Sequence, residues 1–269
     1  MHNFSSQKCR KLFTFYIMRD IILYYIVPDK SGIGGDVLRL DKFLSNMGKA
    51  SRSESGKLVR QGKVLVNGVP AKKSDLQINP DTDEVVLNGV SVTYKKFTYI
   101  MLNKPEGYVS ATDDPHEKTV LDLVDPEDRR KGLFPCGRLD KNTLGLVILT
   151  NDGENAHRLL SPKHHVDKVY RFEALSPISS ADVSNLERGV DIGGYFTKPC
   201  TVHLTGEKTG EITLTEGKYH QIKRMLEAVG NKITYLERIT FGDIKLDNAL
   251  ERGQWRYLTP EEEDLFLKK

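Results

Sequence analysis

The sequence predicts an α+β fold, in which a small helical unit precedes a larger unit built on a mainly antiparallel mixed β-sheet with flanking helices. A chain of 269 residues is long enough for two domains. Nine basic residues against two acidic ones give the segment Arg39–Lys73 a net charge of +7, which leaves −4 for the rest of a chain that totals +3. Beyond residue 97, apparent strands outnumber apparent helices and do not strictly alternate with them, which disfavours a doubly wound sheet.

The first 36 residues differ from the rest of the chain. Phe13–Val27 is apolar but interrupted by Arg19 and Asp20. It is shorter than the ~20 residues of a membrane-spanning helix, and no secretory cleavage site follows it. The segment GGDV at residues 34–37 can be encoded by GGA-GGT-GAT-GTG, a bacterial ribosome-binding sequence followed by a GTG start codon. We therefore expect residues 1–37 to be a poorly ordered extension translated from upstream sequence, and the alternative is a membrane-associating arm.

The unit predicted at residues 38–90 begins with two short helices. Apolar residues recur at helical spacing in Leu40–Met47, and Ser51 and Glu54 have the spacing of a capping box before the second helix. The segment VLVNG at residues 64–68 then predicts a strand that enters a tight hairpin. Exposed basic side chains on such a unit would contact RNA phosphates, and no aromatic platform for stacked bases accompanies them. The residues expected to make these contacts are Arg39, Lys42, Arg52, Lys57, Arg60 and Lys63.

The string RLDKFLSNMGKASRSESGKLVRQGKVLVNG is similar to the S4 RNA-binding domain over some thirty residues. The resemblance implies an RNA-binding module, and the alternative is a protein-docking module of the same shape.

The larger unit is predicted at residues 97–269, after a connection at residues 91–96. The expected strands cover residues 99–102, 146–149, 169–174, 201–204, 211–214 and 233–239. The expected helices cover residues 154–160, 180–188 and 220–229.

The most informative motif of the larger unit is the string GRLDKNTLGL. It places Asp140 in a turn before a buried strand, with Gly137 and Gly145 at positions where the backbone can bend or approach another group closely. Arg138 and Lys141 flank the carboxylate and favour its ionised form. A positioned carboxylate suits nucleophilic or proton-abstracting chemistry, whereas the turn alone would also fit an ordinary surface aspartate. The whole string resembles the catalytic motif of pseudouridine synthases of the RsuA/RluB type, in which this aspartate is the essential residue.

Three further segments extend the resemblance. The family has a segment similar to Asn103–Val109 at the end of a strand, and its tyrosine matching Tyr170 lies against the target base. A phenol can stack on uracil while its oxygen takes part in proton transfer. In the string EGKYHQIKRML, an apolar stripe is expected to bury one helix face. The family pairs its catalytic aspartate with a basic residue that corresponds to Lys223.

The resemblance predicts an isomerase that converts one uridine to pseudouridine, with Asp140, Tyr170 and Lys223 as catalytic residues. Tyr219-His220-Gln221 and residues 161–165 are similar to the small-subunit enzymes, so 16S rRNA is the expected substrate. The alternatives are the same chemistry on 23S rRNA and a catalytically silent RNA-binding assembly factor. The implied substrate-binding residues are Asn103, Lys104, Arg138, Lys168, His220, Gln221, Ile222 and Arg224.

The reaction only rearranges atoms, so no cofactor is expected. Cys9, Cys136 and Cys200 are widely spaced and odd in number, which indicates a reducing compartment and no disulfide framework. No repeated Cys/His spacing predicts a metal site. We expect a cytoplasmic monomer without membrane attachment that acts on rRNA in a pre-ribosomal small-subunit particle.

Overall fold

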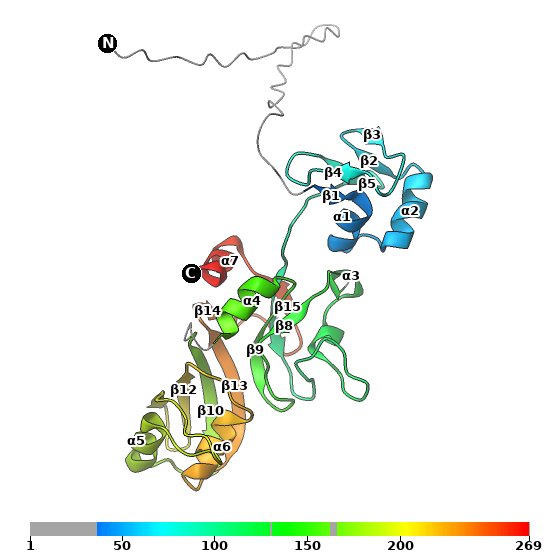
Figure 1. Cartoon of the computed structure of the whole chain (residues 1–269). Coiled ribbons are helices and arrows are strands. Elements are labelled where there is room, and N and C mark those ends of the chain that lie inside the picture. The colour runs from blue at the N-terminus through cyan, green and yellow to red at the C-terminus, as the bar shows by residue number, and fades with distance from the viewer. Residues whose placement is uncertain (1–36, 130, 162–165, 269) are drawn as a thin grey trace, which may run out of the picture.

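The computed structural model describes residues 37–129, 131–161 and 166–268, which form two lobes joined by one extended connection (Figure 1). The expectation for residues 1–36 lies outside the described residues. The elements of the N-terminal lobe are β1 (Leu38–Arg39), α1 (Leu40–Asn46), α2 (Arg52–Arg60), β2 (Val64–Val66), β3 (Val69–Pro70), β4 (Gln77–Ile78), β5 (Val85–Leu87) and β6 (Val90–Val92).

Local chemistry explains the shape of this lobe. The Ser51 side chain accepts a hydrogen bond from the Glu54 backbone N–H, and Glu54 in turn accepts from the Ser51 backbone, so the expected capping box starts α2. Asn67 and Asn88 adopt left-handed conformations at the turns between β2 and β3 and between β5 and β6. The six basic side chains expected to bind RNA are all exposed, although the Arg39 guanidinium already pairs with a neighbouring carboxylate.

The C-terminal lobe is built on a nine-stranded sheet. Seven of its strands have the order β11-β12-β10-β13-β9-β7-β15, and the other two, β14 and β8, pair with β13 and β9. Every pairing in it is antiparallel except the short parallel contact of β9 with β13. The strands are β7 (Tyr99–Lys104), β8 (Phe134–Cys136), β9 (Leu144–Thr150), β10 (Lys168–Ala174), β11 (Thr201–Leu204), β12 (Thr209–Leu214), β13 (Ile233–Phe241), β14 (Ile244–Lys245) and β15 (Trp255–Tyr257). The helical elements are a 3-10 turn η1 (Val120–Leu123), α3 (Pro126–Arg129), α4 (Gly153–Leu160), α5 (Ser180–Arg188), α6 (Gln221–Ala228) and α7 (Pro260–Leu267).

The sheet has a hydrophobic core on each face, because successive side chains of a strand point to opposite sides. On β7, Ile100 and Leu102 join one core, whereas Tyr99 and Met101 join the other. The first core also receives the apolar stripe of α6. This arrangement confirms the predicted α+β class with a mainly antiparallel sheet.

All the strands and helices expected in the larger unit are present, and most extend by one or two residues beyond the expected limits. The sequence analysis did not identify β8, β14, β15 or α7, and the division at residues 90 and 97 stays a prediction. Within the described residues, no helix combines the length and apolar character needed to cross a membrane.

Candidate active site

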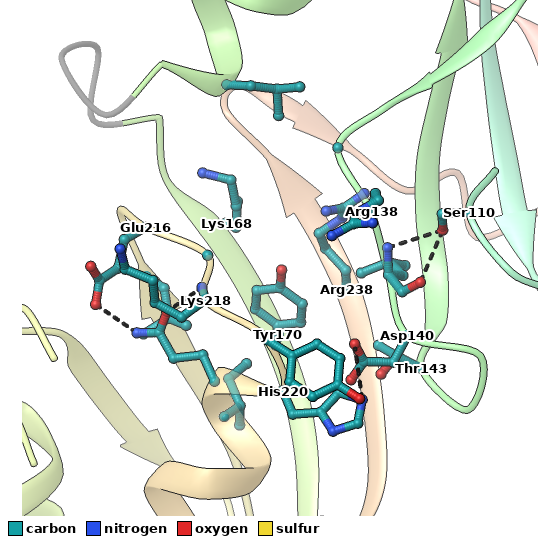
Figure 2. Close-up of a pocket in the computed structure, with 18 of the residues that line it drawn as sticks. Ser110, Arg138, Asp140, Thr143, Lys168, Tyr170, Glu216, Lys218, His220 and Arg238 are labelled. Atoms are coloured by element: carbon teal, nitrogen blue, oxygen red, sulfur yellow. Dashed lines mark hydrogen bonds and ion pairs between the residues drawn. The ribbon is translucent and has the colours of Figure 1, made fainter. Parts of the chain in front are cut away.

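A cavity of about 720 Å³ lies over the middle of the nine-stranded sheet, between the loop that precedes β9 and the segment that leads into α6 (Figure 2). Asp140 stands on the first of these segments and His220 on the second. Tyr170, from strand β10, lines the same cavity beside them. The cavity therefore collects side chains from segments that are far apart in the sequence.

The loop that carries Asp140 is held from below by Lys104 at the end of β7. The Lys104 side chain is fully buried, and its Nζ donates to the carbonyl oxygens of Pro105, Lys141 and Thr143 at 3.1, 3.0 and 2.8 Å. Burial lowers the pKa of Lys104 to about 8, and the nearby Asp140 carboxylate opposes this shift. Lys104 therefore acts as a clamp on the backbone either side of Asp140.

A serine completes the clamp from the other side of the loop. Ser110 Oγ donates to the Leu139 carbonyl and accepts from the Leu139 N–H, both at 3.0 Å. The backbone of Gly107 also donates to the Lys141 carbonyl at 3.0 Å. The segment Asn103–Val109 and the residue just beyond it thus orient the loop that carries Asp140, which gives a physical reason for the two motifs to occur together.

Two glycines allow the loop to take this path. Gly137 and Gly145 have φ values of +84° and +96°, a region that disfavours residues with a Cβ. A Cβ on Gly145 would lie 2.3 Å from the Arg238 carbonyl oxygen, so only glycine permits the parallel contact of β9 with β13. Both positions meet the expectation of a bend or a close approach.

The Asp140 carboxylate faces two basic side chains from the other wall. Lys223 Nζ lies 3.0 Å from Asp140 Oδ2, and His220 Nε2 lies 3.7 Å from Oδ1. The Asp140 side chain keeps 27% of its surface exposed, so a ligand in the cavity can reach it. The ion pair fixes the direction of the carboxylate without sealing it from the cavity.

Helix α6 presents Lys223 because its opposite face is apolar. Ile222, Met225 and Leu226 are buried in the core, which leaves the intervening residue on the cavity side. The helix start is anchored by Gln221, whose side chain donates to Glu216 Oε1 at 2.8 Å and accepts from the Lys218 backbone.

Glu216 is the anchor of the loop that enters α6. Its carboxylate accepts from the Tyr195 hydroxyl at 2.6 Å and from the Lys198 backbone at 3.0 Å. Burial opposes ionisation, but these hydrogen bonds hold the pKa of Glu216 below its usual value. The loop that bears Tyr219 and His220 is therefore fixed at both ends.

The floor of the cavity is formed by β10 and β13. Lys168 and Tyr170 lie on the same side of β10, and Tyr170 is the cross-strand partner of Arg238 on β13. A β-bulge between these strands, at Val169 and Tyr170, changes their register beside the cavity. Burial, and secondly the charge of Arg238, lower the pKa of Lys168 to about 8.

Comparisons with known proteins identify the family of this chain. Residues 98–228 match the family model for RNA pseudouridylate synthase, and residues 38–85 match the S4 domain. The uncharacterized RNA pseudouridine synthase YtzG of Bacillus subtilis is 50% identical over 84% of this chain and 96% of its own length. Ribosomal small subunit pseudouridine synthase A of Vibrio vulnificus is 41% identical over 86% of this chain and 100% of its own length.

The chain belongs to the RNA pseudouridine synthases. It is a member of the RsuA family, with an N-terminal S4 domain that binds RNA. The Escherichia coli K12 ribosomal small subunit pseudouridine synthase A is 37% identical over 84% of this chain and 98% of its own length. A crystal structure of a pseudouridylate synthase aligns with a TM-score of 0.60 at 36% identity, over 86% of this chain and 100% of that chain.

Most of the predicted site residues of the synthase come together around the cavity. Asn103, Lys104 and Arg224 do not line it. Asn103 donates to the Leu250 carbonyl at 2.7 Å and is bonded by Arg252. These contacts and the clamp formed by Lys104 indicate a structural role in place of the expected substrate contact. The predicted residues that line the cavity are Arg138, Asp140, Lys168, Tyr170, His220, Gln221, Ile222 and Lys223.

Sequence reasoning missed Arg238, which lines the cavity and is 1% exposed. A signal was present, because Arg238 follows Leu236 by two residues in an expected strand and therefore lies on the same face as a core residue. The pair His164-His165 lies outside the described residues. Among those described, no group of three or more His, Cys, Asp or Glu side chains is placed to hold a metal ion.

Proposed function

We propose that this synthase isomerises one uridine of 16S rRNA to pseudouridine, with Asp140, Tyr170 and Lys223 as its catalytic residues. The observation that carries the proposal is the 3.0 Å contact between Lys223 and Asp140, at the mouth of a cavity whose floor presents Tyr170.

The charge of the cavity supports an RNA substrate. Seven lysine and arginine residues line it, against the three acidic residues Asp114, Asp140 and Glu216. A target base inside folded RNA must be flipped out, which costs a few kcal/mol. Phosphate contacts with these cations and with the exposed basic residues of the S4 domain supply that energy and make binding sensitive to salt.

The reaction follows from the placement of the three catalytic residues. Asp140 acts on the ribose of the flipped nucleotide, either as a nucleophile at C1′ or as a base at the 2′ position, and the bond from C1′ to N1 breaks. The freed uracil turns against the Tyr170 ring and joins C1′ through C5. Tyr170 then accepts the C5 proton, and N1 gains one, so the product is an isomer of the substrate.

The choice of 16S rRNA is supported by the string Tyr219-His220-Gln221 and by relatives named as ribosomal small subunit enzymes. The family resemblance gives large-subunit enzymes an Asn-Arg pair at the first two of these positions. Here Tyr219 is 73% exposed and its ring stacks on His220 with centroids 3.8 Å apart, at the edge of the cavity. This pair is placed to contact nucleotides that flank the target. We place the enzyme in the cytoplasm, as a monomer that acts on pre-ribosomal particles without a cofactor.

The test is to map pseudouridines by carbodiimide-blocked reverse transcription in a strain that lacks the gene. One reverse-transcription stop in 16S rRNA should disappear when the gene is deleted. It should return when the wild-type gene is restored, and it should stay absent when the restored gene carries Asp140→Asn. Loss of a reverse-transcription stop in 23S rRNA instead would assign the enzyme to the large subunit. An unchanged set of stops in both rRNAs would contradict the proposed activity.

A further inference from the structure

Within the described part of the chain, two buried side-chain polar atoms lack a hydrogen-bond partner, Thr143 Oγ1 and Arg238 Nη2. Both residues line the same cavity. A buried donor of a charged group that is left unbonded destabilises the folded state. The coincidence of both atoms at one cavity indicates that the site is shaped for a group that the substrate brings.

The Arg238 guanidinium is held by one hydrogen bond and one aromatic contact, and it pairs with no carboxylate among the described residues. Its Nε donates to the Leu146 carbonyl at 2.8 Å, and its Cζ lies 5.3 Å from the centre of the Phe241 ring. The neighbouring Glu237 points to the opposite face of the sheet, where its carboxylate pairs with Arg252. The acid next to Arg238 in sequence is therefore not its counter-ion.

A second cation lies close to the same aromatic ring. Lys168 is 9% exposed, its Nζ lies 5.6 Å from the Phe241 ring centre, and it donates to the Val166 carbonyl at 2.7 Å. Two buried cations that repel each other are costly for the folded state, and an anion between them and the cavity would relieve that cost. In Figure 2, Lys168 and Arg238 lie toward the hydroxyl end of Tyr170.

The position of these two cations deep in the cavity indicates which anionic part of the substrate they contact. The ribose must reach Asp140, whose side chain is 27% exposed near the cavity mouth. The phosphates stay with the RNA backbone outside, whereas the flipped base goes deepest and lies against Tyr170. Arg238 is the cross-strand partner of Tyr170 and lines the same cavity, so its side chain lies on the side of the sheet that a base against Tyr170 would occupy.

We propose that Arg238, supported by Lys168, is a catalytic residue that stabilises the negative charge of the uracil between its release from C1′ and its attachment through C5. This inference rests on the proposed function. When the bond from C1′ to N1 breaks, its electron pair stays on uracil and spreads over N1 and the two carbonyl oxygens. When C5 bonds to C1′, a pair from the uracil forms the new bond. On the nucleophile route the ester bond from Asp140 to C1′ breaks and its pair returns to the carboxylate, and on the base route Asp140 returns its proton to C2′. A fixed cation in a water-poor site stabilises such transient charge without reorganisation.

The test compares Arg238→Gln with wild type in single-turnover rate and in RNA affinity. Glutamine can keep a donor near the position of Nε, so the bond to the Leu146 carbonyl is retained while the charge is lost. Arg171→Gln is the matched control, because Arg171 is on β10 next to Tyr170 but faces the other side of the sheet. We expect Arg238→Gln to lower the rate by about 10²–10³-fold, with RNA affinity within about threefold of wild type. Arg238→Lys should restore part of the rate.

A leaving-group comparison makes the test specific to the uracil anion. In transcripts made with 5-fluorouridine, fluorine withdraws electrons and stabilises the anion by itself, so the deficit of Arg238→Gln in consuming the target nucleoside should shrink by about tenfold. A deficit that fluorine does not change, or a loss of RNA affinity that matches the loss of rate, would overturn the inference and favour a phosphate site. Should Arg238→Gln fail to fold, Lys168→Gln is measured in the same way, with a smaller deficit that fluorine again reduces.

The outcome for the proposed function is separate. If wild-type enzyme modifies a 23S transcript and not a 16S transcript, the 16S assignment fails and the Arg238 comparison proceeds on the 23S transcript. If wild type modifies neither transcript, the proposed function and the inference both fail. If wild type is active and Arg238→Gln equals it, only the inference fails.

Discussion

Replacing Lys104 with methionine tests whether the clamp on the loop that carries Asp140 determines both stability and rate. Three hydrogen bonds from one buried ammonium group are lost, and the carbonyl oxygens of Pro105, Lys141 and Thr143 lose that partner. Hydrogen bonds to charged groups contribute about 1.5–3 kcal/mol each. The stabilisation from these hydrogen bonds is partly offset by the cost of burying the charge. The fall in the pKa of Lys104 from 10.5 to about 8 corresponds to a cost of about 3 kcal/mol.

We therefore expect Lys104→Met to lower the free energy of unfolding by about 3 kcal/mol at pH 7.5. The effect should depend on pH. Between pH 8 and 10.5 the unfolded chain holds the Lys104 proton more tightly than the folded chain, so the contribution of Lys104 to stability rises with pH. The deficit of the variant should thus grow by about 2 kcal/mol from pH 7.5 to 9.5.

The chain carries a convenient probe for this measurement. Trp255 is the single tryptophan and pairs with Leu102 on β7, two residues from Lys104, so its fluorescence in a urea titration reports the catalytic lobe. Lys245→Met serves as control, because Lys245 is exposed on β14. Single-turnover rate should fall more than RNA affinity, because the loop that holds Asp140 loosens. A stability loss below about 1 kcal/mol that does not change with pH would refute the clamp.

Three further changes test the remaining parts of the site. Lys223→Met removes the partner of Asp140 at 3.0 Å and should lower kcat by about 10²-fold or more, and Lys223→Arg should have an intermediate kcat. Equal rates in the two variants would contradict the ion-pair role. Tyr170→Phe keeps the ring but not the hydroxyl, so release of tritium from C5 of labelled uridine should slow while filter-binding affinity stays unchanged, and a normal tritium release would exclude the phenol as the base. Deleting residues 1–90 should weaken rRNA binding and flatten its salt dependence while the Trp255 unfolding transition persists, and undiminished affinity would exclude the S4 domain as the main RNA contact.

Periodicity and capping signals predicted most of the fold. The strand at residues 201–204 and the helix at residues 180–188 have the expected limits, because their apolar spacing and caps are strong. Helix α7 was missed although Thr259 and Glu262 form a capping box before it, since its acidic first turn hides the apolar pattern. Strand β15 has only three residues, too few for an alternation to be visible.

The candidate site was only partly predictable, because its parts depend on different kinds of information. Residues alone indicated that Asp140 is a positioned carboxylate, but its pairing with Lys223 required the family resemblance, since the two lie on separate segments. Lys104 was predicted to contact the substrate, but the structure buries its side chain against three backbone carbonyl groups. The sequence of a motif does not indicate whether its lysine side chain faces outward to an anion or inward to backbone carbonyl groups.

Arg238 shows how the sheet itself couples the two ends of the reaction. Its backbone forms the parallel contact with Gly145, directly after the loop that carries Asp140, while its side chain turns to the floor beside Tyr170. The same residue therefore helps to set the distance between the Asp140 carboxylate and its own guanidinium. A shift of β13 against β9 would change this separation, and the pairing of the two strands keeps it constant. The arrangement suits a reaction in which one bond to C1′ is broken and another is made while the uracil stays inside the cavity.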